Sequence, residues 1–431
     1  MANSAHPDRA TIESAQLEAL RTLVAELLPA NKFYARKMES VGVGFDVASL
    51  ADFSTRFPFT AKSELVADQL KHPPFGTNLT YPLNRYRRYH QTSGTSGVPL
   101  RWLDTEENWE SMIESWTEIF NAAEVKVGDR VMFAFSFGPF IGFWLAFESA
   151  SRLGCLCLPG GGLSSAARLR MMRDNRASVL CCTPTYAMRL AEVATAEKID
   201  TTSLGVKTIV VAGEPGGSIP ATRARLESLW PGARIFDHHG MTEVGPVTFE
   251  CPKQPGLLHV IESAYYAEVI NPSTGKPAHS GELILTTLGR IGSPLLRYRT
   301  GDLVTLGTRN SELGTLCACG RHNLSLVGGI LGRVDDMVIV RGVNVYPSAV
   351  EEIIRRFNDV AEYCVHVSGA AALTELQVEI EPIDLCRDAE ALVRQVQKAL
   401  ETALHLRVPV EAVAAGSLPR FEMKAHRWKR G

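Results

Sequence analysis

Apolar and polar positions follow two different rhythms along the chain. In the N-terminal part, apolar positions recur at helical spacing in stretches such as 12–28, which predicts helices. From about 105 to 290, short apolar runs alternate with longer helical patterns. We predict helices at 105–123, 143–154 and 166–176 and strands at 129–135, 155–159, 178–182 and 206–213. Strands separated by helices need crossover connections, so this region predicts parallel sheets covered by helices.

The pattern changes near residue 330, at a Gly- and Asp-rich stretch, 328–336, that is typical of a hinge. After it we predict a strand at 337–342, a helix at 348–357, strands at 362–369 and 375–382, a helix at 389–404 and a basic tail. These elements make a compact domain of roughly 100 residues. We therefore expect an α/β fold, with a large N-terminal domain (1–331) of mixed α/β sheets with flanking helices and a small C-terminal α+β domain (332–431).

Composition narrows the class of protein. The 431 residues are 45% hydrophobic and 21% charged, as in ordinary globular proteins. A formal net charge of -2 gives no reason to expect a nucleic acid or a membrane as partner. The first residues lack the apolar core of a signal peptide, so we expect a cytoplasmic protein. Its nine cysteines are then reduced thiols or metal ligands.

Six consecutive small residues, Thr92 to Gly97, form either a flexible linker or a loop that holds a ligand. The flanking segments have the pattern of ordered chain, which favours a loop whose glycines let the backbone approach an anion. No Lys follows Gly97, so this is not a Walker A loop. Val98 stands where a nucleophile elbow requires Gly, which argues against a serine hydrolase. A bound phosphate would need positive charge from elsewhere in the chain.

Four sequence blocks occur in order: QTSGTSGVP at 91–99, DHHGMTEVG at 237–245, RYRTGDLV at 297–304 with GRVDD at 332–336, and LPRFEMKAHR at 418–427. This ordered set resembles the adenylate-forming superfamily of acyl-CoA synthetases, luciferases and nonribosomal adenylation domains. The match is closest to its phenylacetate-CoA ligase family, through the segments TPTYAMRLAE, GEPGG, GLLHV, CACGR and RVDDMVIVRGVNVYPSAVEEI.

The resemblance implies a two-step reaction that uses ATP, Mg²⁺ and coenzyme A. A carboxylate attacks the α-phosphate of ATP to give an acyl adenylate and pyrophosphate, and the thiol of coenzyme A then displaces AMP. It also implies that the C-terminal domain is mobile and turns about a hinge at 329–335 between the two steps.

The resemblance further implies a set of nucleotide-binding residues. Those around the β- and γ-phosphates are Thr92, Ser93, Gly94, Thr95, Ser96 and Gly97. Others in the nucleotide site are Gly213, Glu214, Pro215, Asp237, His238, His239, Gly240 and Met241, and Gly342 lies at the pantetheine tunnel. His239 stands where the family usually has a Tyr that stacks on adenine. Read from the residues alone, the His238–His239 pair could equally bind a metal or act as a general base.

Five more residues carry charge or hydrogen bonds in this implied site. Thr242 contacts the α-phosphate, and Glu243 is the Mg²⁺ ligand. Asp302 accepts hydrogen bonds from ribose, and Arg333 binds ribose or phosphate. Lys424 is the missing cation, which bridges the carboxylate and the α-phosphate during adenylation. Taken alone, Glu243 would be a surface carboxylate and Asp302 a turn cap. Arg333 would form a surface ion pair, and Lys424 would belong to a solvated basic tail.

The acyl pocket implied by the resemblance is apolar. Its candidate residues are Phe137, Phe140, Ile141, Tyr186 and the turn from Gly213 to Gly216. Phenylalanine side chains suggest a flat slot for an aromatic acid, although core packing explains such residues equally well. Gly216 stands where the family commonly has Trp. The absence of the bulky Trp side chain would leave room for a larger or substituted ring.

Three cysteines and one histidine have the donor set of a closed structural zinc site. They are Cys251, His259, Cys317 and Cys319. Their spacing is not that of a standard zinc finger, and buried thiols without a ligand beside a surface His are the alternative interpretation.

We conclude from the sequence that the protein is an ATP-dependent ligase that converts an aromatic carboxylic acid into a coenzyme A thioester. One alternative is an adenylating enzyme that delivers the acyl group to a carrier-protein thiol or an amine. Another is a nonenzymatic nucleotide- or zinc-binding regulator, which would have no need of Glu243, Asp302 and Lys424 together. The sequence does not determine the oligomeric state, for which a homodimer is one alternative.

Overall fold

The computed structural model describes residues 6–27, 30–92, 98–307, 316–341, 343–369, 374–422 and 424–430, with only the backbone of Phe143. The chain divides into two compact units, each made of two segments. The first unit is Met1–Gly161 with Asp237–Gly329, and the second is Gly162–Phe236 with Ile330–Gly431. The break between Gly329 and Ile330 lies close to the predicted domain boundary at 331/332. The two units do not test the predicted domains, because the second unit also contains residues 162–236.

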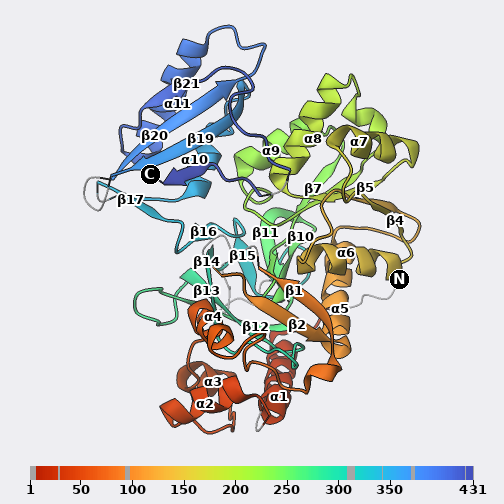
Figure 1. The fold of residues 1–431 in the computed structure, drawn as a ribbon, viewed down its shortest axis with the longest axis vertical. Helices are drawn as coiled ribbons and strands as arrows, with labels where there is room; N and C mark the ends of the chain where they lie inside the picture. The colour runs from red at the N-terminus through yellow and green to blue at the C-terminus, as the bar shows by residue number, and fades with distance from the viewer. Residues whose placement is uncertain are drawn as a thin grey trace. The chain divides into compact units, whose positions relative to one another are not determined.

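Helices gather at the N-terminal end of the first unit (Figure 1). They are α1 (Arg9–Leu27), α2 (Lys32–Val41), α3 (Leu50–Arg56), α4 (Lys62–Lys71) and the 3₁₀ turn η1 (Leu83–Arg85), followed by α5 (Glu106–Ala122) and α6 (Ile141–Arg152). Local chemistry sets their ends. The side chains of Asn31 and Thr105 accept backbone N–H bonds at the starts of α2 and α5, and each satisfies one donor that the helix itself leaves unpaired.

Several small sheets position the motif blocks of the first unit. β1 (Tyr86–Gln91) and β2 (Arg101–Thr105) form a hairpin, β3 (Arg130–Phe133) pairs in parallel with β4 (Leu156–Pro159), and β8 (Gly240–Met241) pairs with β9 (Gly245–Pro246). Two further antiparallel sets are β10 (Thr248–Cys251), β11 (Gln254–Val260) and β15 (Ser325–Val327), and β12 (Tyr265–Ile270), β13 (Ser280–Thr287) and β14 (Tyr298–Thr305).

The second unit begins with a parallel α/β segment. Its elements are α7 (Ser165–Asp174), β5 (Val179–Cys182), α8 (Pro184–Ala196), the 3₁₀ turn η2 (Thr201–Leu204), β6 (Thr208–Val211), α9 (Pro220–Leu229) and β7 (Arg234–Asp237). β5 and β6 pair in parallel, as the alternation of helices and strands predicts. The turn after β6 leads to Gly213, whose φ of 93° lies in the region that favours glycine.

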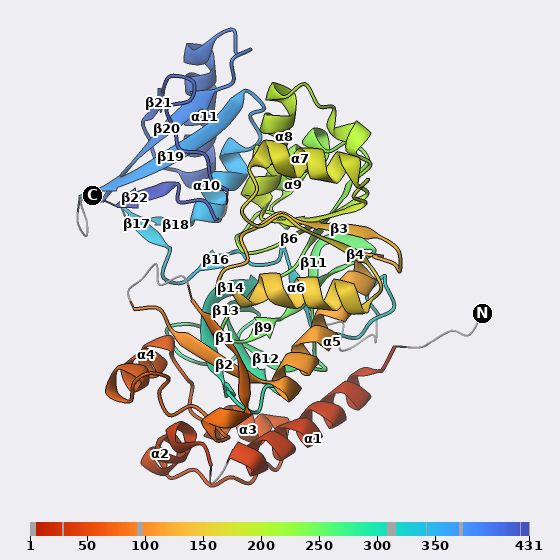
Figure 2. The same ribbon diagram turned by 45° about the vertical axis from the view of Figure 1, so that its right-hand side comes forward.

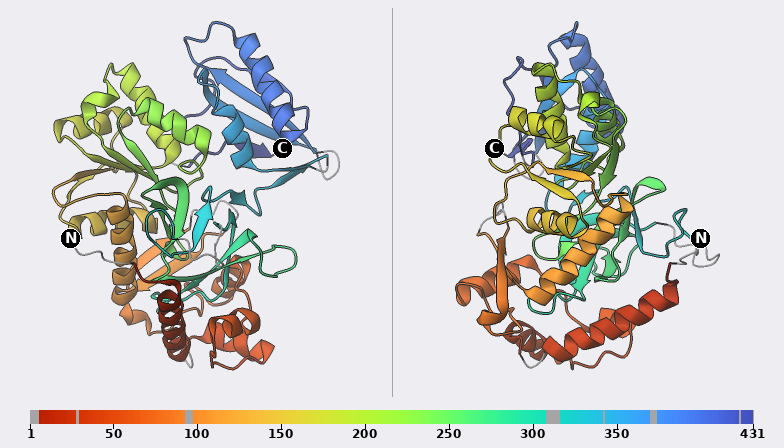
Figure 3. Two further views of the ribbon diagram at one scale, coloured as in Figure 1. Left: turned by 180° about the vertical axis from the view of Figure 1, so that it is seen from behind. Right: turned by 90° about the vertical axis from the view of Figure 1, so that its right-hand side faces the viewer.

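The rest of the second unit is the C-terminal domain (Figures 2 and 3). It contains β16 (Gly332–Arg333), β17 (Val338–Val340), β18 (Val343–Val345), α10 (Pro347–Ile354), β19 (Val360–Ser368), β20 (Glu375–Pro382), α11 (Ala389–Leu404), β21 (Val410–Ala412) and β22 (Trp428–Arg430). One apolar core joins α10, α11 and the sheet β21-β20-β19-β22. α11 contributes a buried residue every fourth position, from Leu392 to Leu404, as its helical pattern predicts.

The mixed α/β fold with a separate C-terminal domain is confirmed, and so are the main predicted elements. The predicted basic tail is wrong in one respect. Residues 428–430 form β22, which pairs in parallel with β19 and lies at the edge of the sheet, because backbone hydrogen bonds to β19 need no apolar period in the sequence. Among the described residues, none of the helices combines the length and the apolar character that crossing a membrane requires.

Candidate active site

The base of the β1–β2 hairpin is closed by Thr92. Its N–H donates to the Leu100 carbonyl at 3.0 Å, and its hydroxyl oxygen accepts the Leu100 N–H at 3.0 Å. Thr92 is buried, so this predicted phosphate residue also acts as a clamp at the foot of the loop. Ser93, Gly94, Thr95, Ser96 and Gly97 lie outside the described residues.

A tight hairpin, β8–β9, presents Thr242 and Glu243 at its turn. Gly240 has no space for a side chain, since a Cβ there would lie 2.8 Å from the Gly245 carbonyl oxygen. Met241 pairs with Gly245, whose φ of 95° again favours glycine. Glycine at both positions therefore allows the two strands to turn within a few residues and to place the half-buried Thr242 at the tip.

A buried ion pair that the motifs do not include holds this turn. Arg290 Nη1 donates to the carbonyl oxygens of Thr242 and Glu243 at 2.9 and 2.7 Å. Its Nε and Nη2 donate to the two carboxylate oxygens of Asp104 on β2, each at 2.6 Å. Burial acts to raise the pKa of Asp104, but the Arg290 guanidinium together with His90 outweighs burial and holds that pKa below its usual value. Arg290 thus connects the Thr-Glu turn to the strand that follows the phosphate loop.

The Glu243 carboxylate is buried and faces a cation. Lys62 Nζ lies 2.9 Å from Glu243 Oε1, and the Tyr298 hydroxyl donates to the same oxygen at 3.5 Å. A buried hard oxygen ligand fits the predicted role of Glu243 in Mg²⁺ binding, and Lys62 supplies the positive charge beside it in this structure. Lys62 lies in α4, far from the motifs, and sequence reasoning missed it.

The structure brings together two predicted nucleotide residues, His239 and Asp302. His239 Nε2 lies 3.1 Å from Asp302 Oδ2. The backbone N–H of His239 donates to Thr248 Oγ1 at 2.8 Å, and the Asp302 N–H donates to Thr300 Oγ1 at 3.0 Å. The backbone N–H of each residue is therefore held by a threonine hydroxyl, and the His239 imidazole lies beside the carboxylate predicted to bind ribose.

The neighbouring His238, also predicted to lie in the nucleotide site, is buried in the unit. Its side chain is only 6% exposed and packs edge-to-face against Trp116 of α5, with ring centroids 4.4 Å apart. Burial, reinforced by the adjacent His239, lowers the pKa of His238 to about 3, so the ring is neutral near pH 7. His238 does not belong to either of the groups of three or more potential metal ligands found among the described residues. Asp237, which ends β7, is buried as well.

In the second unit, the turn after β6 lies beside the Lys424 segment. A Cβ built on Gly213 would be 3.7 Å from Lys424 Cε. The Glu214 carboxylate accepts the Thr185 N–H at 2.9 Å through one oxygen and the Ala425 N–H at 2.8 Å through the other. Glu214, predicted to contact the nucleotide, therefore clamps the residue next to Lys424 to the N-terminus of α8, and Pro215 follows it as an exposed residue.

Two predicted pocket residues of this unit are packed against the protein itself. Tyr186 is fully buried, and its hydroxyl lies 2.9 Å from Ser165 Oγ and accepts a bond from Arg168. A Cβ on Gly216 would lie 2.6 Å from the ring of Pro184. The expectation that Gly216 leaves free space for a larger substrate is therefore wrong, because Pro184 already fills that space.

The predicted hinge residue Arg333 pairs locally. Its Nε and Nη2 donate to the Asp335 carboxylate at 2.9 and 3.2 Å. Gly342, predicted to lie at the pantetheine tunnel, is outside the described residues.

The predicted acyl residues of the first unit belong to an aromatic cluster. The Phe137 ring is 5.2 Å from Trp144 and 5.5 Å from Phe147, both at steep interplanar angles. Phe140 is half-buried at the start of α6, whereas Ile141, its first residue, is buried in the core. Phe137 and Phe140 thus remain the partly accessible members of the predicted pocket.

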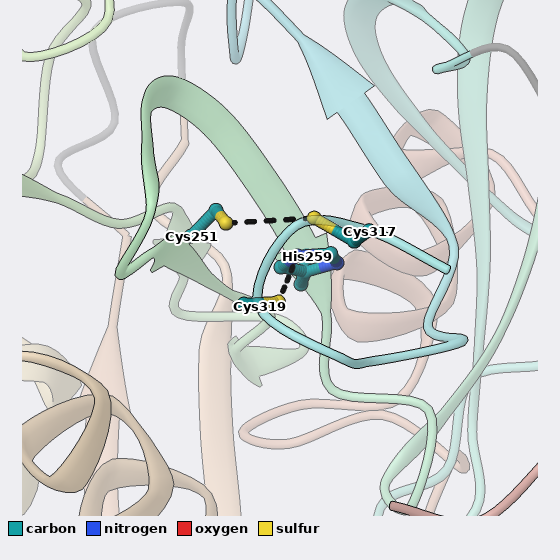
Figure 4. A group of neighbouring side chains, drawn as sticks. All are labelled: Cys251, His259, Cys317 and Cys319. Atoms are coloured by element: carbon teal, nitrogen blue, oxygen red, sulfur yellow. Dashed lines mark hydrogen bonds between the residues drawn. The ribbon is translucent and has the colours of Figure 1, made fainter. Parts of the chain in front are cut away.

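Cys251, His259, Cys317 and Cys319 come together, as their donor types predict (Figure 4). Their ligand atoms all lie within 4.8 Å of one another. The sulfur atoms of Cys251 and Cys317 are 3.5 Å apart, and Cys319 Sγ is 3.4 Å from His259 Nε2. A tetrahedral Zn²⁺ with Zn–S bonds of about 2.3 Å requires sulfur atoms roughly 3.8 Å apart, so the group fits this ion.

The local environment also suits a metal. Cys251 ends β10 and His259 lies on β11, and both are fully buried. Burial lowers the pKa of His259 to about 4, so its imidazole is neutral near pH 7 and keeps a lone pair. The alternative with a surface His is therefore wrong for His259.

Comparison with known proteins agrees with this geometry. A family model for the AMP-binding enzyme matches residues 90–288, and one for the AMP-binding enzyme C-terminal domain matches residues 342–429. The phenylacetate-coenzyme A ligase of Thermus thermophilus is 30% identical over 440 residues, covering 96% of this chain and 95% of that protein. The phenylacetate-coenzyme A ligase of Escherichia coli is 30% identical and covers 96% of each chain.

A solved structure gives the same result. A 2-hydroxyisobutyryl-CoA ligase in the postadenylation state, complexed with R3-HIB-AMP, superposes with a TM-score of 0.92 at 27% identity, covering 100% of this chain and 93% of that one. Fold and site therefore define an AMP-binding enzyme. The chain belongs to the phenylacetate-coenzyme A ligase family, and it is an AMP-forming acid–CoA ligase that acts through an acyl adenylate.

Proposed function

We propose that the protein activates an aromatic carboxylic acid, either an aryl or an arylacetic acid, and transfers it to coenzyme A. The observation that carries this proposal is the near full-length similarity to phenylacetate-coenzyme A ligases. The aromatic cluster around Phe137 supports it, since aromatic side chains at 5–6 Å separations make favourable ring contacts with a flat ligand.

The residue roles follow from the family pattern and from the contacts of each side chain. Thr242 contacts the α-phosphate at the tip of its hairpin, and Glu243 would hold Mg²⁺, whose charge helps to neutralise the triphosphate. Asp302 binds ribose, and His239 orients that carboxylate. Lys424 bridges the attacking carboxylate and the α-phosphate, which lowers the repulsion between two anions. The loop that contains Thr92 and Gly97 holds the outer phosphates.

We also propose that Cys251, His259, Cys317 and Cys319 hold a structural Zn²⁺. A closed set of four protein ligands leaves no position for a substrate, so the ion would tie the segment before β15 to the β10–β11 hairpin and take no part in the chemistry. The short sulfur–sulfur distance and the complete burial of two ligands support this assignment.

A panel of carboxylic acids, assayed for pyrophosphate release with and without coenzyme A, tests the function. Aromatic acids should give sustained pyrophosphate release and a thioester only when coenzyme A is present. Release that requires a carrier protein or an amine instead would identify a different acceptor, and release with aliphatic acids alone would refute the aromatic assignment. The panel should include 2-hydroxyisobutyrate, because the structural relative is named for the thioester of that acid.

A further inference from the structure

A buried histidine in the first unit has polar atoms that the protein does not use. His238 follows β7 and is 6% exposed. Within the part of the chain that the structure describes, neither its Nδ1 nor its Nε2 has a hydrogen-bond partner. Buried polar atoms in proteins are nearly always bonded, so each exception requires an explanation.

The aromatic neighbour of His238 cannot supply what is missing. Trp116 lies 4.4 Å away between ring centroids, at an interplanar angle of 71°. An indole face can accept a weak N–H contact but cannot donate. A neutral imidazole has one donor and one acceptor nitrogen, and in the observed arrangement of the two rings the indole does not donate to that acceptor. The indole Nε1 of Trp116 is itself a buried donor without a partner among the described residues.

The place of His238 in the unit relates this unpaired group to the reaction. His239, the next residue, contacts Asp302. β8 begins directly after His239 and contacts α6, the helix that begins at Ile141 and follows Phe137 and Phe140. His238 therefore directly precedes a segment that contacts both a proposed nucleotide residue and the helix next to the proposed acyl residues.

We propose that His238, assisted by Trp116, recognises a hydroxyl group on the carboxylic acid, so that the preferred substrate is a hydroxylated acid. A hydroxyl group can donate its proton to the acceptor nitrogen of the imidazole and accept the N–H of Trp116. An acid with a hydrogen or a methyl group in that position would leave these atoms unpaired. A second carboxylate on the acid would not be attracted to this place, because the neutral His238 ring carries no positive charge. This inference rests on the proposed function, because it assigns a property of the acid in the same site.

The test compares acids that differ by one hydroxyl group. Phenylacetate is paired with its 2-, 3- and 4-hydroxy derivatives, benzoate with the hydroxybenzoates, and isobutyrate with 2-hydroxyisobutyrate. For one hydroxyl position, the kcat/KM of the wild type should be about 10- to 100-fold higher than for the plain acid, the effect of leaving a buried hydrogen-bonding group unpaired.

Variants identify the residue responsible. His238→Leu should bring this ratio close to one, whereas His238→Gln should retain most of it, since an amide also offers a donor and an acceptor. Trp116→Phe should lower the ratio while keeping an aromatic ring. His279→Leu, which changes a histidine of the same unit outside the proposed site, should leave the ratio as in the wild type. Thermal melting of each variant confirms that it is folded.

The outcomes separate this inference from the proposed function. If the wild type uses plain and hydroxylated acids equally well, or if His238→Leu keeps the wild-type ratio, His238 does not recognise a hydroxyl and the aromatic ligase function still stands. If aromatic acids of the panel release no pyrophosphate while 2-hydroxyisobutyrate does and isobutyrate is a much poorer substrate, the aromatic assignment fails and the hydroxyl recognition stands. If none of the acids releases pyrophosphate, both fail.

Discussion

The buried side chain of Arg290 holds the backbone of Thr242 and Glu243, the two residues proposed to bind the α-phosphate and Mg²⁺. It satisfies two carbonyl groups and one carboxylate at once, which a planar guanidinium with five donors can do and a lysine cannot. No motif names Arg290 or Asp104. Asp104, the one acidic residue of β2, was the only signal in the sequence, and it does not reveal the partner.

Replacement of Arg290 by Met should destabilise the protein strongly. It leaves the Asp104 carboxylate buried without a counter-ion, so the free energy of unfolding should fall by about 3–5 kcal/mol in a denaturant titration. The kcat/KM for ATP should fall too, because the carbonyls of the Thr242–Glu243 turn lose their donor. Arg85→Met is the matched control, since Arg85 forms an exposed ion pair with Glu107 and should cost at most about 1 kcal/mol. Similar losses in both variants would contradict the role of Arg290.

At the scale of elements, local sequence patterns were a good guide. The helix predicted at 389–404 and the strand predicted at 375–382 agree with α11 and β20, because their apolar periods are long and regular. The strand β22 was missed, since its three residues are too few to show a period and become a strand only by pairing with β19. Strands of this kind depend on tertiary contacts more than on propensity.

The hairpin β10–β11 and the segment before β15 should depend on zinc. Elemental analysis of the purified protein should find about one zinc per chain, as a closed four-ligand site requires. Cys317→Ser and Cys319→Ser should lose the zinc and lower the melting temperature, and a strong chelator should do the same to the wild type. Cys386→Ser, a change at a half-buried cysteine outside the cluster, should keep the zinc. A zinc-free protein with the full melting temperature would show that these thiols carry no ion.

A buried charge network in the C-terminal domain joins α10, β19 and the last strand segment. Glu351 faces Arg355 at 2.9 Å and Arg427 at 3.5 Å, and Arg427 also bonds the Glu362 carboxylate at 2.7 Å. Burial acts to raise the pKa of Glu351, but Arg427 and Arg355 outweigh it and lower that pKa to about 2. The network is therefore stable only while Glu351 is ionised.

This network predicts acid sensitivity of the C-terminal domain. In the unfolded chain the Glu351 pKa is about 4.3, so its contribution, about 3 kcal/mol, is complete above that pH and is lost as the pH falls towards 2. Amide hydrogen exchange of β19, corrected for the intrinsic rate at each pH, should show protection falling across this range. In Glu351→Gln the difference from the wild type should be largest above pH 5 and should shrink below it. Glu390→Gln, at an exposed carboxylate, should follow the wild type. A constant difference at every pH would exclude this role of Glu351.

At the scale of the whole molecule, the proposed chemistry draws on residues from distant parts of the chain. The phosphate loop begins at Thr92, the Thr-Glu turn lies at 242–243, and the proposed catalytic cation is Lys424. Glu214 binds the backbone next to Lys424, so the position of this cation is set by a residue far from it in sequence.

Lys424→Ala should separate the two half-reactions. Pyrophosphate release from the acid and ATP should fall by at least about 100-fold, the usual effect of removing one charged group that stabilises a transition state. Thioester formation from a supplied acyl adenylate should change by only a few fold. Lys398→Ala, at a lysine of α11 outside the proposed site, should leave both steps unchanged. Equal losses in the two steps would show that Lys424 does not act in adenylation.

The sequence by itself determined the family, the α/β fold with a separate C-terminal domain, most long helices and strands, and the membership of the Cys251 cluster. These depend on ordered motifs, on apolar periods and on donor types, which are properties of single segments. Only the tertiary structure decided that Arg290 supports the Thr-Glu turn, that Glu214 clamps the Lys424 segment, that Pro184 fills the space beside Gly216 and that His238 is buried without partners among the described residues. Each of these depends on contacts between residues that are remote in sequence, and their distance is set by the packing of the elements that carry them.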